Sequence, residues 1–181
     1  NTNGGWIYGE DAVSKTNNDF SFLADLNYLK DQQKLYYWAL TTYEKSLSLK
    51  INDRFQIGGG LGFTASNTET FNLIISDGLL YENTKNMEPD TYGRETYEVL
   101  RNSFRIKFRI SIKDRLILEG NNFLQNALED RHDYIVKSAT SASVKLNKWL
   151  SLTTTLLYNR LNLTGTENLM MNYGLSIEKY F

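Results

Sequence analysis

The sequence has 181 residues, which is enough for one domain or for one barrel of about eight to ten strands. Its 20 basic and 21 acidic residues nearly cancel, and no basic run is present, which argues against a nucleic-acid partner. Cysteine is absent, which excludes a disulfide framework, a thiolate metal site and a cysteine nucleophile.

The composition favours strands over helices. Twelve Tyr, nine Phe and three Trp suit pleated surfaces, and there is only one Pro, a residue that strand ladders exclude. No apolar run reaches the roughly 18 residues that a transmembrane helix needs. The first five residues lack the regions of an export signal, so we expect a mature or trimmed chain.

Alternating apolar and polar residues predict four strands in the N-terminal part of the chain. They begin near residue 6 and then cover residues 20–28, about 35–50 and 55–64. We expect a turn at 14–18 and a tight hairpin turn at Asn52–Asp53. The glycines of residues 58–62 predict curvature, or the close approach of a bulky neighbour.

The same alternation predicts six more strands. They cover residues 70–82, 100–113, 116–125, 134–146, 150–158 and 168–181, with loops at 83–94, 129–133 and 162–168. Residues 100–113 alternate most clearly, since one face carries Leu, Asn, Phe and Ile and the other is almost entirely Arg, Lys and Ser. A period of two over 14 residues excludes a helix there.

The alternation is compatible with two folds, a membrane barrel and a soluble antiparallel sheet. On a soluble sheet the other strands would also carry fully charged outer faces, but residues 134–146 and 150–158 place small Ser and Thr on their second face. Such residues suit a narrow lumen. We therefore predict one domain over residues 1–181, an all-β transmembrane antiparallel up-and-down β-barrel of about ten strands, with both termini periplasmic.

The last strand resembles the closing strand of bacterial outer-membrane barrels. Its apolar face ends on an aromatic residue, and the resemblance implies an assembly signal made by Tyr173, Leu175, Ile177 and Phe181.

Four segments resemble the salt-induced outer membrane protein family in its Bacteroidetes-like form. They are Tyr37-Trp38 with Tyr43-Glu44-Lys45, the glycine-rich stretch 57–63, the stretch 76–82, and Arg101-Asn102-Ser103-Phe104-Arg105. The resemblance covers about residues 35–113 and implies a small outer-membrane barrel without agreed catalytic residues. Lys179 departs from the terminal pattern, where an apolar residue is usual.

A ladder of charges on the predicted inner face is the main candidate site. It comprises Arg101, Arg105, Lys107, Arg109, Lys113 and Glu119. A hairpin turn around Asp114 places Arg109 opposite Glu119, which predicts an ion pair. We interpret the ladder as a charge network that plugs the lumen. The alternative hypothesis is an anion-preferring pore lined by Arg105, Lys107 and Arg109.

His132 raises the alternative of an outer-membrane hydrolase. It is the only histidine, within Asp130-Arg131-His132-Asp133, but no motif fixes a nucleophile near it. The nearby carboxylates lack the spacing of a calcium loop. We therefore predict no enzyme activity, no cofactor and no metal site.

The functional prediction is a small barrel in the bacterial outer membrane with a structural or interaction role, which includes that of an accessory subunit in a larger assembly. Its expected partners are outer-membrane lipids and lipopolysaccharide, the barrel-assembly machinery during insertion, and other outer-membrane proteins. No nucleic acid is expected.

Overall fold

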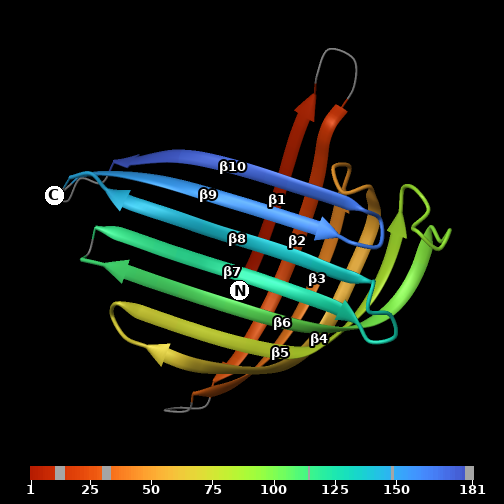
Figure 1. The fold of residues 1–181 in the computed structure, drawn as a ribbon, viewed down its shortest axis with the longest axis horizontal. Coiled ribbons are helices and arrows are strands. Elements are labelled where there is room, and N and C mark those ends of the chain that lie inside the picture. The colour runs from red at the N-terminus through yellow and green to blue at the C-terminus, as the bar shows by residue number, and fades with distance from the viewer. Residues whose placement is uncertain (11–14, 30–33, 114, 148, 178–181) are drawn as a thin grey trace.

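The computed structural model describes residues 1–10, 15–29, 34–113, 115–147 and 149–177. Within these ranges one antiparallel sheet holds ten strands in chain order (Figure 1). The strands are β1 Thr2–Glu10, β2 Lys15–Leu29, β3 Leu35–Ser46, β4 Ile51–Asn67, β5 Phe71–Asn86, β6 Thr96–Ile112, β7 Leu116–Ala127, β8 Tyr134–Lys145, β9 Leu150–Leu161 and β10 Thr166–Ile177. No helix in these ranges is long and apolar enough to cross a membrane.

The sheet curls into a half-barrel. In Figure 1, β5 to β10 run side by side across the view, while β1 and β2 cross them at a steep angle. The predicted all-β, up-and-down antiparallel order of ten strands is confirmed. No ladder joins β1 to β10 in the described ranges, so these two strands are open edges and a closed ring is not seen.

Successive antiparallel strands give the half-barrel two ends. We call the end with the β3–β4, β5–β6, β7–β8 and β9–β10 connections the loop end, and the opposite end, with the β4–β5, β6–β7 and β8–β9 connections, the turn end. The longest connection, 87–95, lies at the loop end. The first residue of β1 and the last residue of β10 both lie at the turn end, as an even number of antiparallel strands requires.

Three predicted turns differ from the structure. Asn52–Asp53 belongs to β4, and the chain instead turns at 47–50, where Lys50 has a φ of 56° and a register shift follows between Ile51 and Asp53. The predicted loop 83–94 begins too early, because β5 continues to Asn86. The predicted turn at 14–18 is wrong from Lys15 onward, where β2 begins, and residues 11–14 lie outside the described ranges.

The two faces of the sheet have opposite polarity. On β6, Phe104 and its alternate neighbours point outward, while Arg101 and Ser103 are buried inside. The outer face exposes large apolar side chains on every strand except β9, among them Trp6, Leu26, Tyr37, Leu61, Leu79, Leu100, Leu124, Val144, Leu169 and Tyr173. The sequence alternation therefore sorts residues to the inside and outside as predicted, with the polar side enclosed.

Glycines on the inner face let aromatic rings approach the backbone. A Cβ on Gly60 would overlap the backbone of Asp77 and Gly78 on β5, and a Cβ on Gly78 would overlap the Trp38 ring. The indole of Trp38 is 9% exposed and donates from Nε1 to the Leu61 carbonyl oxygen at 3.2 Å. The predicted close approach of a bulky neighbour is thus confirmed at β4 and β5.

We predict that Gly60→Ala lowers the free energy of unfolding by about 1–3 kcal/mol, because the methyl group must displace the β5 backbone. Gly174→Ala on β10 is the matched control, since nothing lies within 4 Å of the added Cβ. Denaturant titration followed by tryptophan fluorescence measures both variants. Equal stability of the two variants would contradict the packing described for β4 and β5.

Candidate functional site

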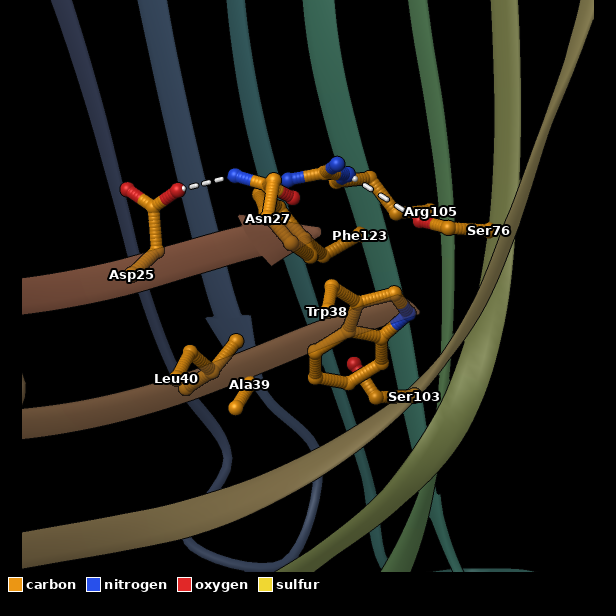
Figure 2. Close-up of a pocket in the computed structure, with 9 residues that line it drawn as sticks. All are labelled: Asp25, Asn27, Trp38, Ala39, Leu40, Ser76, Ser103, Arg105 and Phe123. Carbon is orange, nitrogen blue, oxygen red and sulfur yellow. Dashed lines mark hydrogen bonds between the residues drawn. The ribbon is translucent and has the colours of Figure 1, made fainter. Parts of the chain in front are cut away.

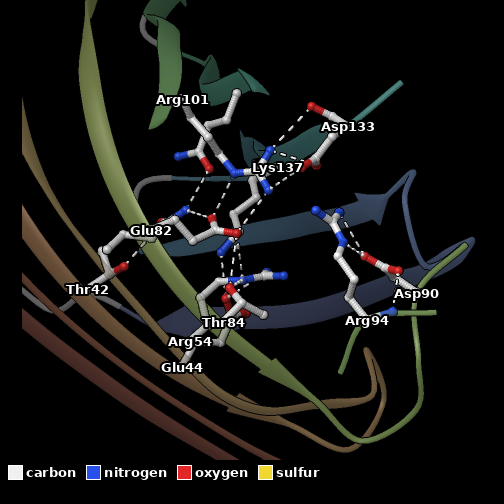
Figure 3. Close-up of polar contacts among 12 residues, drawn as sticks. Thr42, Glu44, Arg54, Glu82, Thr84, Asp90, Arg94, Arg101, Asp133 and Lys137 are labelled. Carbon is white, nitrogen blue, oxygen red and sulfur yellow. Dashed lines mark hydrogen bonds and ion pairs between the residues drawn. The ribbon is translucent and has the colours of Figure 1, made fainter. Parts of the chain in front are cut away.

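The inner face at the loop end carries a buried polar cluster, which we call the Glu82 network. Its members are Arg54, Gln56, Glu82, Thr84, Arg101, Gln125 and Asp133, all of them buried. Figure 3 shows most of these side chains converging from several strands. Because successive residues of a strand point to opposite faces, the network members on strands project inward, away from the apolar outer face. Asp133 joins them from the connection before β8.

Glu82 on β5 is the centre of the network and has no solvent exposure. Arg101 donates to both of its carboxylate oxygens, from Nε to Oε2 and from Nη2 to Oε1, each at 2.9 Å. Gln56 donates to Oε2 at 2.6 Å and Thr84 to Oε1 at 3.0 Å. Four hydrogen bonds, two of them from a charged guanidinium, thus replace the water that this carboxylate lost on folding.

Arg101 also reaches the segment before β8. Its Nη1 donates to Asp133 Oδ1 at 2.7 Å and its Nη2 donates to Asp133 Oδ2 at 3.1 Å. The planar guanidinium therefore binds one carboxylate on each side, a geometry that lysine cannot reproduce. This single side chain ties β5, β6 and the β7–β8 connection together.

Arg54 on β4 is a second fully buried cation. It lies 3.8 Å from Glu82 and 3.6 Å from Glu44, and Glu44 in turn accepts a hydrogen bond from Lys137 Nζ at 2.8 Å. Glu44 lies on β3 and Lys137 on β8, so this pair spans the interior from one wall to the other. The contact crosses the interior beside the Glu82 network.

An apolar cluster lies at the same end. Leu49, Ile51, Ile135 and Leu161 are buried together, from the β3–β4 connection, β4, β8 and β9. Gln56 on β4 donates to Gln125 on β7 at 3.0 Å. Polar and apolar contacts therefore cross the interior at the loop end.

The remainder of the interior is hollow. A cavity of about 710 Å³ is lined by residues of β1, β2, β3, β6, β7, β8 and β9, including Glu44 and Lys137. A neighbouring cavity of about 500 Å³, nearer the turn end, shares Lys107 and Asn121 with it. The two cavities extend from the Glu44–Lys137 contact toward the turn end.

The structure disperses the predicted charge ladder instead of gathering it. Arg101 belongs to the Glu82 network, and Arg105 donates to Ser76 and Tyr36. Lys107 faces the cavities, and Lys113 follows β6 at the turn end with a φ of 50°.

Arg109 donates to Glu119 at 3.0 Å, in the register expected from the hairpin. About half of each of these side chains is exposed, so the pair is screened by solvent.

The sequence reasoning missed most members of the Glu82 network. Arg54 and Gln56 share the face of Gly58 on β4, and Glu82 shares the face of Leu80 on β5, so alternation alone puts them inside. The signal available in the sequence was the occurrence of two arginines and one glutamate at inward-facing positions of adjacent strands.

His132 lies on the exposed surface of the β7–β8 connection. Its backbone N–H donates to Asp130 Oδ1 at 2.9 Å, and Tyr92 donates its hydroxyl to Asp130 Oδ2 at 2.7 Å. The bond from Tyr92 lowers the pKa of the Asp130 carboxyl and raises the pKa of the Tyr92 hydroxyl. In the described part of the chain no group of three or more His, Asp or Glu side chains is arranged to hold a metal ion.

Three residues of the predicted assembly signal lie on the outer face of β10. Tyr173, Leu175 and Ile177 are each about 70% exposed. Phe181 lies outside the described residues.

We predict that Glu82→Gln lowers the free energy of unfolding by about 3–5 kcal/mol, because Arg54 and Arg101 then lose a buried counter-charge. Glu119→Gln removes the same charge from a half-exposed pair and should cost at most about 1 kcal/mol. Denaturant titration of both variants separates the two sites. Similar losses in both would mean that water screens the Glu82 network.

The comparisons with known proteins place the chain in a family without assigning it an activity. No curated protein matches it. Residues 1–168 match the family described as "Protein of unknown function, DUF481". Since the match spans most of the sequence, the chain belongs to this family of unknown function.

Proposed function

We propose that this chain is an integral outer-membrane β-barrel protein of a Gram-negative bacterium, with a structural or interaction role and no catalytic activity. The reversed polarity of the sheet carries the proposal. Arg54, Glu82 and Arg101 are fully buried, while large apolar side chains cover the outside. A sheet in water hides its apolar face, whereas a barrel in hydrocarbon presents that face to lipid and encloses polar residues.

Membrane insertion also requires the open edges to be paired. The unpaired backbone groups of β1 and β10 would have no hydrogen-bond partners in hydrocarbon, so we infer that the two edges join and close the ring. The shorter connections at the turn end favour a periplasmic position for that end, which also holds the start of β1 and the end of β10.

The proposed partners follow from this placement. The apolar outer face suits outer-membrane lipids, and the 87–95 connection at the loop end would face lipopolysaccharide. The outward row on β10, with Phe181, would serve as the signal that the barrel-assembly machinery reads. The resemblance of residues 35–113 to salt-induced outer membrane proteins supports the same localisation.

A polar pair on the outer face supports an accessory role beside another outer-membrane protein. Asn102 on β6 donates to Asp77 Oδ1 on β5 at 2.6 Å, among apolar outward residues such as Leu79. A carboxylate facing lipid is unfavourable. A neighbouring protein that donates a hydrogen bond to Asp77 would relieve that cost.

We expect the purified chain to need detergent or lipid to remain monodisperse, because its outer surface is apolar. Folded and boiled samples should migrate differently in gel electrophoresis, since a closed ring resists unfolding by detergent alone. Size-exclusion chromatography in plain buffer is the direct measurement. A monodisperse folded protein without detergent would overturn the membrane proposal.

A narrow anion-preferring pore is the second candidate. The positive side chains of Arg105, Lys107 and Arg109 on β6 and the two interior cavities favour it. The filled loop end opposes it, because Glu44 and Lys137 meet across the lumen. We therefore rank the plugged barrel first.

Planar bilayers distinguish the two candidates. We predict no steady single-channel openings from the inserted protein, because ions cannot pass the Glu82 network. The pore would instead give openings whose anion preference disappears in the double variant Arg105→Gln, Arg109→Gln. Lys45→Gln is the control, since Lys45 pairs with Asp53 at 3.1 Å and lies on the outer face.

A further inference from the structure

The larger interior cavity has the form of a ligand pocket and not of a channel. Its volume of about 710 Å³ lies within the roughly 300–1,000 Å³ usual for small-molecule sites. Glu44 and Lys137 line it and bind each other at 2.8 Å, and they form its floor toward the loop end. A molecule entering from the turn end would therefore be held and not conducted.

Arg105 is fixed on the wall of this cavity by β6. Its Nε donates to Ser76 at 3.2 Å, its Nη2 donates to Tyr36 at 3.0 Å, and its guanidinium lies 5.6 Å from the centre of the Phe123 ring. Figure 2 shows the guanidinium beside Phe123 and above Trp38. Its partners are neutral, and among the described contacts Nη1 has no hydrogen-bond acceptor. The positive charge is therefore held in place without a counter-charge.

Lys107 adds a second free charge to the same wall. It follows Arg105 by two residues on β6, so both side chains project from one face. Within the described residues no hydrogen bond or ion pair engages Lys107. The other cation of the cavity, Lys137, is already paired with Glu44.

The remaining lining indicates what else the ligand carries. Leu23, Leu40 and Leu157 contribute apolar surface beside the Phe123 ring. The carboxylate of Asp25 lies across the cavity on β2, where it accepts a hydrogen bond from Asn27 and forms no ion pair with Arg105 in the described structure (Figure 2). The site thus offers two cations on one wall and an apolar lining, with Asp25 opposite and Glu44 already paired with Lys137.

We propose that this cavity binds a small organic anion, a carboxylate or a phosphate attached to an apolar group, with Arg105 and Lys107 holding the anionic end. The apolar group packs against Phe123 and the leucines. The proposal goes beyond a structural role, and it rests on the interior cavity and not on the membrane that surrounds the barrel.

The test uses the purified, folded full-length chain and three probes of similar shape. Benzoate and phenyl phosphate carry the two anionic groups, and benzyl alcohol is the neutral analogue. Saturation-transfer NMR and isothermal titration should show one bound benzoate or phenyl phosphate per chain and no comparable binding of benzyl alcohol. The tighter of the two anions identifies the ligand as a carboxylate or a phosphate.

Two variants assign the binding to this wall. Lys107→Gln and Arg105→Gln should each weaken anion binding about tenfold or more, as expected for loss of a charged hydrogen-bond donor. Lys45→Gln removes a positive charge from the outer face and should leave binding unchanged. Should Arg105→Gln fail to fold, Lys107→Gln still decides the matter, because Lys107 makes no contact that the fold depends on.

Absence of anion binding to the folded chain would refute the proposal, and so would equal binding of benzyl alcohol or undiminished binding by both cavity variants. These results are independent of the detergent requirement. A chain that stays soluble in plain buffer but binds benzoate would retain the cavity site while losing the membrane proposal. A detergent-dependent barrel that binds no anion would do the reverse.

Discussion

The structure depends on how one buried carboxylate is neutralised. Glu82 has no exposure to water. Burying a carboxylate without a partner would cost on the order of several kcal/mol, even after the surroundings relax. Arg101 and Arg54 supply the compensating charge from the two strands that flank β5. The positions of β4, β5 and β6 relative to one another are thereby fixed by charge as well as by the ladder of backbone hydrogen bonds.

This arrangement determines which face of the sheet is outside. Because alternate residues point to opposite faces, enclosing Arg101 and Glu82 places Leu100 and Tyr81 on the exterior. A register shift of one residue would expose the charges and bury the apolar residues. The Glu82 network therefore specifies the register, and through the register it specifies the apolar surface from which a membrane location is inferred.

The sequence predicted the elements better than the contacts between them. Residues 100–113 alternate so regularly that the faces of β6 followed directly, and the hairpin after β6 aligned Arg109 with Glu119 as expected. The turn predicted at Asn52–Asp53 was wrong, although Asn and Asp are common in turns. The chain instead turns at Lys50, which has a positive φ, and a bulge follows between Ile51 and Asp53. Gln56 meets Gln125 across 69 residues of sequence, and local periodicity carries no information about such a pair.

Contacts cross the lumen at the loop end, and the curvature of the sheet at β4 and β5 contributes to this. Glycines on β4 and β5 let Trp38 approach the backbone, so the sheet bends enough for Glu44 on β3 to meet Lys137 on β8. Nearer the turn end lie the two cavities. Paired charges that cross the lumen at one end, with unpaired cations on the remaining wall, favour the proposed binding of small anions over their conduction. The charge ladder that was predicted to plug the lumen thus divides along β6, since Arg101 joins the buried Glu82 network while Arg105 and Lys107 line the proposed anion site.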